Sequence, residues 1–118
     1  MVETSCHCGQ VRFALPQAPE TVTACNCSSC RRYGTLWAYY PKDEVRRIDP
    51  KGATEVYVWG AGAREFHRCA KCGCVTHWQP LKPEAARMGV NARMLEPEVL
   101  AMARVRRLDG ADTWEYLD

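Results

Sequence analysis

The chain lacks long hydrophobic runs and has no strong excess of either charge. None of its apolar stretches approaches the roughly 20 residues that a membrane-spanning helix requires. Its 16 Lys and Arg residues nearly balance its 14 Asp and Glu residues, which gives a formal net charge of +2. It therefore lacks the basic character that is typical of nucleic-acid-binding domains. The sequence predicts neither a membrane protein nor a nucleic-acid partner.

The first residues also lack the features of a secretion signal. Residues 1–6 contain neither a basic start nor an apolar stretch. We therefore expect a cytoplasmic protein, in a compartment where thiols stay reduced. With 118 residues, the chain has the length of a single domain, residues 1–118. The hydrophobic core of such a domain is modest, so a bound metal would add to its stability.

Helical patterns are scarce in this sequence. Most of the chain consists of short apolar or aromatic segments that end at proline or glycine, which is typical of β-strands. One or two helical turns are expected at 28–34, ending at Gly34, and another at 97–102, beginning at Pro97. The expected strands are residues 11–15, 21–24, 36–40, 55–59, 64–68, 75–78, 87–92 and 103–106. The sequence thus predicts a mainly β fold with little helix.

Cysteine, in contrast, is abundant: the chain has eight. Seven of them lie in three clusters, namely Cys6 and Cys8, then Cys25, Cys27 and Cys30, and finally Cys69 and Cys72. Thiols at such spacing in a reducing compartment are typical of zinc ligands. A structural zinc takes four protein ligands, whereas a catalytic zinc takes three and keeps one position open. Seven thiols therefore predict one closed and one open zinc site.

This division changes the charge of the metal-loaded protein. Seven thiolates and two Zn²⁺ ions would change the formal net charge from +2 to −1, because seven negative and four positive charges are added. This further disfavours a nucleic-acid partner. The alternative interpretation is a small oxidised domain with four disulfides, which the lack of a secretion signal disfavours.

The closed site is predicted from a detail that two clusters share. Each ends in Cys-Gly, at Cys8 and at Cys72. In a metal-binding turn the backbone N–H groups point at the thiolate sulfur, and the glycine accepts the positive φ that this turn needs. The four ligands of the predicted structural zinc are Cys6, Cys8, Cys69 and Cys72. The alternative is that these are buried cysteines without a metal.

The open site is predicted at Cys25, Cys27 and Cys30, which no glycine follows. Cys30 falls in the expected first helical turn, where the helix dipole favours a thiolate. Three thiolates leave a zinc ion with one net negative charge, which Arg31 or Arg32 could offset, or either could bind a substrate carboxylate. A soft zinc–thiolate site suits sulfur-containing substrates. The alternative is a second closed site, with Cys74 or a histidine as fourth ligand.

Three residues around the third cluster are weaker candidates. We expect Cys74 to be a small buried side chain, and a fourth metal ligand is the alternative. We expect His67 and His77 to be structural strand residues, and a role as base or as hydrogen-bond donor is the alternative. The aromatic residues expected in the core are Trp37, Tyr39, Tyr40, Trp59 and Trp78.

Three segments in this order resemble the GFA family, whose members include the glutathione-dependent formaldehyde-activating enzymes and centromere protein V. They are residues 6–13, 25–34 and 66–74, and the resemblance extends over essentially the whole chain. It implies a β-tent of curved antiparallel sheets that is stapled by zinc. It also implies that the first and third clusters hold a structural zinc. The implied catalytic residues are Cys25, Cys27 and Cys30.

The resemblance implies a carbon–sulfur lyase activity as well: glutathione and formaldehyde would give S-hydroxymethylglutathione. The implied cofactors are two zinc ions per chain, one structural and one catalytic, and the implied partner is a small-molecule thiol such as glutathione. Two alternatives stay open. One is a non-enzymatic zinc module that binds a protein partner. The other is a thiol redox enzyme, similar to a methionine sulfoxide reductase, with Cys74 or Cys30 as nucleophile.

Overall fold

The computed structural model describes all residues, 1–118, and is mainly β, as predicted. The strands are β1 (Val2–Ser5), β2 (Arg12–Leu15), β3 (Thr21–Cys25), β4 (Trp37–Pro41), β5 (Arg46–Ile48), β6 (Thr54–Tyr57), β7 (Arg64–Cys69), β8 (Val75–Pro80), β9 (Arg87–Asn91) and β10 (Arg104–Leu108). The helices are α1 (Cys30–Tyr33), α2 (Pro97–Leu100) and a 3₁₀ turn, Ala92–Met94. Neither α-helix reaches the length or hydropathy of a membrane-spanning segment.

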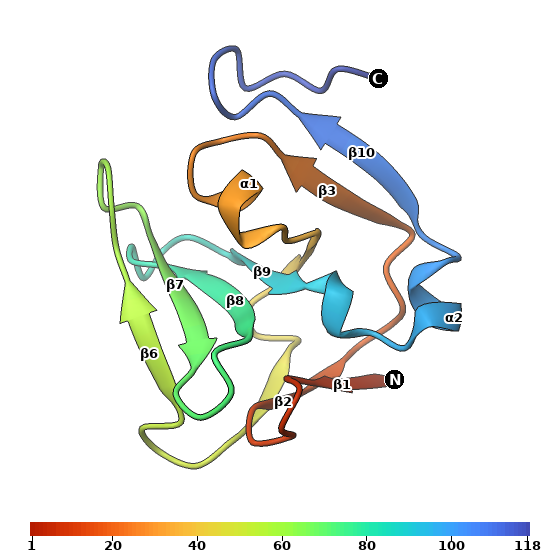
Figure 1. The fold of residues 1–118 in the computed structure, drawn as a ribbon, viewed down its shortest axis with the longest axis vertical. Helices are drawn as coiled ribbons and strands as arrows, with labels where there is room; N and C mark the ends of the chain where they lie inside the picture. Colours follow the sequence, from red (N-terminus) through yellow and green to blue (C-terminus); the bar gives the residue numbers. More distant parts are fainter.

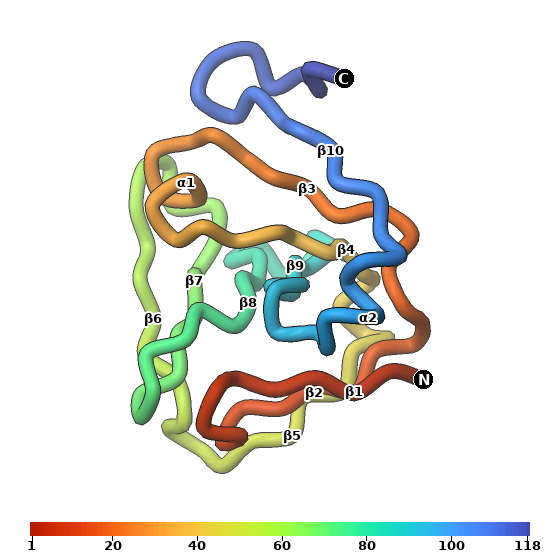
Figure 2. Tube along the Cα trace, turned by 45° about the vertical axis from the view of Figure 1, so that its right-hand side comes forward, coloured from red at the N-terminus to blue at the C-terminus, as the bar shows by residue number.

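The strands form two sheets. Seven strands pair in the order β10-β3-β4-β9-β8-β7-β6, and three pair in the order β1-β2-β5. Figures 1 and 2 show the larger sheet curving from β10 at one end of the molecule to β6, with β1 and β2 near the opposite end from β10. All strand pairs are antiparallel, as the family resemblance implies, except β3 and β10, which run parallel.

The three-stranded sheet contains the two strands that the sequence analysis missed, β1 and β5. Both are edge strands on either side of β2. Their side chains are mostly polar and partly exposed, so neither strand has the alternation of apolar residues that identifies a strand in a sequence. β2 is different, because Phe13, Ala14 and Leu15 are all buried in the core.

The main core is a cluster of 14 buried residues drawn from both sheets, including Phe13, Leu15, Val22 and Val90. Three of the five aromatic residues expected in the core are buried, namely Trp37, Tyr40 and Trp78. The expectation was wrong for Trp59, which is 40% exposed. This residue follows β6 at the edge of the larger sheet, where no further strand covers it.

A partly buried polar network connects the two sheets through β5. The rings of His67 and His77 stack with their centroids 4.2 Å apart. The Arg47 guanidinium on β5 lies 3.5 Å from His77 Nε2 and donates to Asp49 at 2.7 Å. Burial lowers the pKa of His77 to about 2 and also lowers the pKa of His67, so both rings are neutral at neutral pH. Both histidines therefore have structural partners, as expected.

Candidate metal centres

The first thiol cluster is built from two tight turns. Cys6 and Cys8 lie in the turn from β1 to β2, and Cys72 lies in the turn from β7 to β8. Figure 2 shows these two turns near each other at the lower end of the molecule. Gly9 and Gly73 have φ angles of +83° and +80°, the positive values that the Cys-Gly pairs predicted. The two sheets thus meet at this cluster.

The sulfur atoms of Cys6, Cys8, Cys69 and Cys72 all lie within 4.8 Å of one another. The distance from Cys6 Sγ to Cys8 Sγ is 3.7 Å, and from Cys8 Sγ to Cys69 Sγ 3.6 Å. In a tetrahedron with Zn–S bonds of about 2.3 Å, the sulfur atoms are about 3.8 Å apart. A disulfide would need about 2.05 Å, and no cysteine forms one. The four thiols therefore fit a four-coordinate metal.

Backbone N–H groups donate hydrogen bonds to two of the four sulfurs of this cluster. The amide of Val11 donates to Cys6 Sγ at 3.3 Å, and the amides of Lys71 and Cys72 donate to Cys69 Sγ at 3.4 and 3.5 Å. Cys6 and Cys69 are 2% and 1% exposed, so solvent has little access to their sulfurs. Four protein ligands, two of them with buried and amide-supported sulfurs, leave no position free for a substrate.

The second cluster is formed by Cys25, Cys27 and Cys30, whose sulfur atoms also lie within 4.8 Å of one another. Cys25 ends β3, and Cys30 begins α1. α1 ends at Gly34, whose φ of 68° confirms the predicted stop. The Cys30 amide donates to Cys27 Sγ at 3.4 Å, so the start of α1 folds back over the preceding loop.

An aromatic wall surrounds these three thiols. Trp37, Phe66 and Trp78 pack with Cys27 and Cys30 in a second, smaller core. The Trp37 indole N–H donates to Cys30 Sγ at 3.3 Å. This contact favours a negative charge on the sulfur in surroundings that otherwise exclude water.

The thiols of the second cluster also affect each other. Hydrogen bonding from Cys30 lowers the pKa of Cys25 to about 5. The same interaction, together with burial, raises the pKa of Cys30. Without a bound metal, the expectation that the start of α1 favours a Cys30 thiolate is therefore wrong. α1 has four residues, too few to give a strong dipole. A cation shared by the three sulfurs would remove this competition for a proton.

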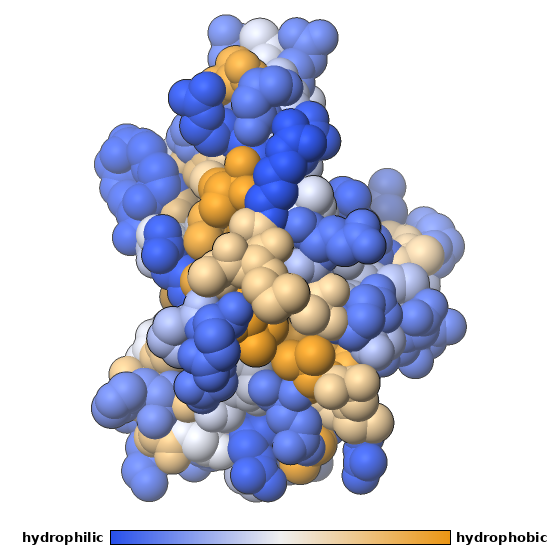
Figure 3. All heavy atoms as spheres, turned by 90° about the vertical axis from the view of Figure 1, so that its right-hand side faces the viewer, coloured by the Kyte–Doolittle hydropathy of each residue, from blue (hydrophilic) through white to orange (hydrophobic).

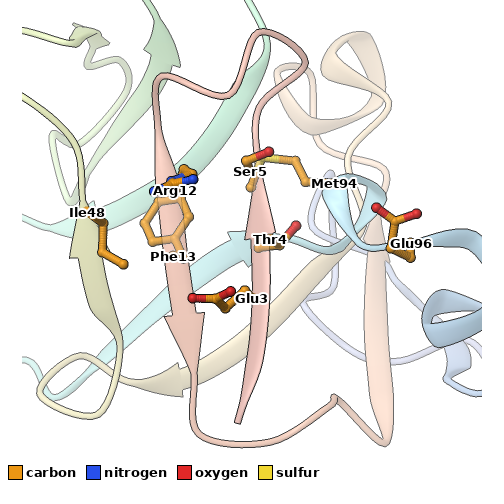
Figure 4. Close-up of a pocket in the computed structure, with 8 residues that line it drawn as sticks. All are labelled: Glu3, Thr4, Ser5, Arg12, Phe13, Ile48, Met94 and Glu96. Carbon is orange, nitrogen blue, oxygen red and sulfur yellow. The ribbon is translucent and has the colours of Figure 1, made fainter.

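The second cluster lies at the base of a cavity. All three cysteines line a hollow of about 30 Å³, together with Arg64, Phe66 and Trp114 among others. These last three residues and Cys27 also line an adjoining cavity of about 170 Å³. A separate cavity of about 210 Å³ beside β1, lined by Glu3, Arg12 and Glu96 among others, contains no cysteine (Figure 4). Among the thiol clusters, only the second lines one of these cavities.

The loop after β10 covers one side of the second cluster, and the sequence analysis missed it. Asn26 anchors it: its side-chain amide donates to Asp109 Oδ1 at 3.0 Å, and its oxygen accepts from the Ala111 amide at 2.9 Å. A Cβ atom on Gly110 would overlap Cys25 Sγ, and the Gly110 amide helps to lower the pKa of Cys25. No residue pattern links this loop to the cysteines, because the segments are far apart in the chain.

We expect Gly110→Ala to weaken metal binding at the second cluster without unfolding the protein. The added methyl group would occupy the space of Cys25 Sγ and displace it from the other two sulfurs. Displacing a ligand from the required geometry should lower metal affinity about 10- to 100-fold, as does the loss of a group that holds a ligand in position. The measurement is zinc content and zinc affinity by competition with a chromophoric chelator. Ala111→Ser on the same loop is the control, and unchanged affinity in Gly110→Ala would contradict the prediction.

The remaining predicted residues lie outside both cavities that the second cluster lines. Arg31 and Arg32 are exposed on α1. Arg32 donates to the Ser28 carbonyl at 2.8 Å and lines a neighbouring hollow of about 280 Å³, which it shares with Trp59. Cys74 belongs to neither thiol cluster and donates to the Val75 carbonyl at 3.6 Å.

Comparison with known proteins agrees with this architecture. A family model described as "Glutathione-dependent formaldehyde-activating enzyme" (GFA) matches residues 1–105. No curated protein matches the chain. A solved structure of a protein from Rhodobacter sphaeroides is similar, with 26% identity and a TM-score of 0.71, over 88% of this chain and 99% of that one. The family match ends before the loop that carries Gly110 and Trp114.

Proposed function

The chain belongs to the GFA family, and on that basis we propose that it is a zinc-dependent carbon–sulfur lyase. Its substrate would be an adduct of glutathione or another thiol, as in S-hydroxymethylglutathione synthesis. One observation carries the proposal: three thiols are gathered at the base of a cavity, whereas the other four form a closed cluster. Three protein ligands are the number that a catalytic zinc requires.

The two clusters would then have different tasks. Cys6, Cys8, Cys69 and Cys72 would hold a structural zinc that joins the sheets. Cys25, Cys27 and Cys30 would hold the catalytic zinc. When bound there, zinc supplies a Lewis acid that lowers the pKa of a thiol or polarises a carbonyl oxygen.

In the reaction, the sulfur of the thiol forms a bond to the carbonyl carbon of the aldehyde. The carbonyl π electrons move to the oxygen, which takes up the proton that the thiol released; cleavage is the reverse. The protein would contribute by confining both reactants. Phe66 and Trp78 exclude water from the thiols, and the loop with Gly110 fixes the position of Cys25. Holding two reactants together removes most of the entropic cost of their encounter.

Arg31 and Arg32 remain our candidates for a substrate carboxylate at the outer part of the site. Arg32 is the better candidate, because the 280 Å³ hollow that it lines shares Trp59 with the 170 Å³ cavity. A tripeptide with its sulfur at the second cluster would extend across Trp59 toward the Arg32 guanidinium. Exposed ion pairs contribute little, so we assign this contact a modest share of the binding free energy.

We expect glutathione and its hydroxymethyl adduct to bind to the zinc-loaded protein in calorimetric titration. Arg32→Ala should weaken binding by several-fold, a smaller loss than the roughly 10-fold or more of a buried charge-assisted contact. Arg31→Ala should have the smaller effect, because Arg31 lines neither hollow. Binding that survives both substitutions would keep the lyase proposal and remove the arginines from it. If no low-molecular-weight thiol binds, the lyase proposal fails.

If no low-molecular-weight thiol binds, the second candidate function, a zinc module that binds a protein partner, would be favoured. A specific observation supports it: Val56, Tyr57, Val58 and Trp59 are 40–49% exposed in and just after the edge strand β6. Exposed apolar edges of this kind bind other chains. The other exposed apolar band, on the face that carries α2 (Figure 3), faces away from β6. A thiol redox activity of Cys74 has no such support, because burial raises the pKa of its thiol.

A further inference from the structure

Arg64 is a cation in a cavity whose other lining is almost entirely apolar. It lines both the 30 Å³ hollow with the three cysteines and the adjoining 170 Å³ cavity, and no other basic side chain and no carboxylate lines either. Three arginine–carboxylate ion pairs occur in the structure, and Arg64 takes part in none of them. A partly buried guanidinium that lacks a carboxylate within the protein is placed to receive an anion from solution.

The way in which Arg64 is held leaves its hydrogen-bond donors free. Its guanidinium stacks 4.7 Å above the Trp78 ring and lies 5.9 Å from the Trp114 ring. Such contacts use the flat faces of the guanidinium. The N–H groups lie at its edge, and they make no hydrogen bond within the protein. An edge with several parallel donors matches the two oxygens of a carboxylate.

We propose that Arg64 is a specificity-determining residue that binds a carboxylate located close to the substrate's sulfur. The proposal rests on the proposed function, since it assumes that the second cluster binds a thiol. The hollow that Arg64 lines with the three cysteines has room for about one or two water molecules, so only a small group fits there. The favoured substrates are therefore thiols that carry a carboxylate two or three carbons from the sulfur.

Charge gives a second reason for this assignment. Three thiolates and one zinc ion carry a net charge of −1, and a bound thiolate with a carboxylate adds two more negative charges. In a cavity with aromatic walls, screening by water is weak, so these charges repel one another strongly. Arg64 is the one residue of the lining that can offset them. A thiol without a carboxylate needs this compensation less. The charge of Arg64 therefore favours the binding of thiols that carry a carboxylate.

The test compares 3-mercaptopropionate with 2-mercaptoethanol, which has a hydroxyl group in place of the carboxylate. Both are titrated calorimetrically into zinc-loaded protein, and zinc content is measured before and after. The wild type should bind 3-mercaptopropionate about 10- to 100-fold more tightly. Arg64→Met keeps the stem between the indole rings but removes the charge. It should abolish this preference by weakening 3-mercaptopropionate binding much more than 2-mercaptoethanol binding, since only 3-mercaptopropionate makes a charge-assisted bond to Arg64.

Two further variants make the result specific. Arg64→Lys keeps the charge but not the planar pair of donors, so part of the preference should remain. Arg68→Met is the matched control on β7, because Arg68 pairs with Glu55 at 3.0 Å and lines neither cavity. Equal binding of the two thiols by the wild type, or a preference that persists in Arg64→Met, overturns the role of Arg64 while thiol binding stands. Failure of both thiols to bind the wild type removes the proposed function itself.

Discussion

Replacement of Cys72 by serine should leave the protein largely unfolded or insoluble. The four-thiol cluster is where the turns of the two sheets meet, and its sulfurs have nearly the spacing of a zinc tetrahedron. Binding of a structural zinc contributes about 10–16 kcal/mol in small zinc-binding domains. The net stability of a domain is about 5–15 kcal/mol, so a damaged site removes most or all of it. Circular dichroism and soluble yield, at equal zinc concentration, are the measurements.

Cys74→Ser is the matched control for that experiment. Cys74 lies two residues further along the same turn, is also partly buried, and belongs to neither thiol cluster. The variant should remain folded and keep the zinc content of the wild type. If Cys72→Ser folds as well as Cys74→Ser, the four thiols do not form a structural metal site. If Cys74→Ser also loses zinc, Cys74 is the fourth ligand that the sequence left open.

The residue pattern predicted the grouping of the thiols better than the sheets that hold them. Cysteines two or three residues apart lie together in any compact turn, so their grouping depends on local chain geometry. The positive φ of Gly9 and Gly73 was predicted for the same reason. The parallel pairing of β3 with β10 was not, because it depends on a connection of about eighty residues between the strands, which no local pattern records.

The lining of the cavity over the second cluster likewise depends on long-range contacts that no local pattern records. The sequence placed the candidate anion-binding residues at Arg31 and Arg32, the cations nearest to the second cluster in the chain. The structure brings Arg64 to the thiols from β7, and Trp114 from the loop after β10. Neither belongs to a cysteine motif, and Trp114 lies beyond the residues that the family model matches. The chemistry of a site can thus be expected from its ligands, whereas its specificity depends on segments that only the fold brings together.

Replacement of Cys27 by serine should have a different outcome: a folded protein that has lost the second metal and thiol binding together. Cys27 is one of the five residues of the smaller core and is not part of the main core. Two thiolates hold zinc far more weakly than three, so about one equivalent should be missing. Mild chelation of the wild type should produce the same state, because three ligands with one exchangeable position release metal faster than four.

Three measurements on Cys27→Ser test this prediction: zinc content, circular dichroism and glutathione titration. Ser28→Ala, the adjacent substitution at an exposed side chain, is the control and should behave as the wild type. Unfolding of Cys27→Ser to the same extent as Cys72→Ser would make the second cluster structural and remove the main support for a lyase. Retained thiol binding in a folded Cys27→Ser that lacks the second zinc would place the thiol site elsewhere. The proposal requires that the fold persist while metal and thiol binding are lost together, because only then do three thiols at the base of a cavity form a reaction centre.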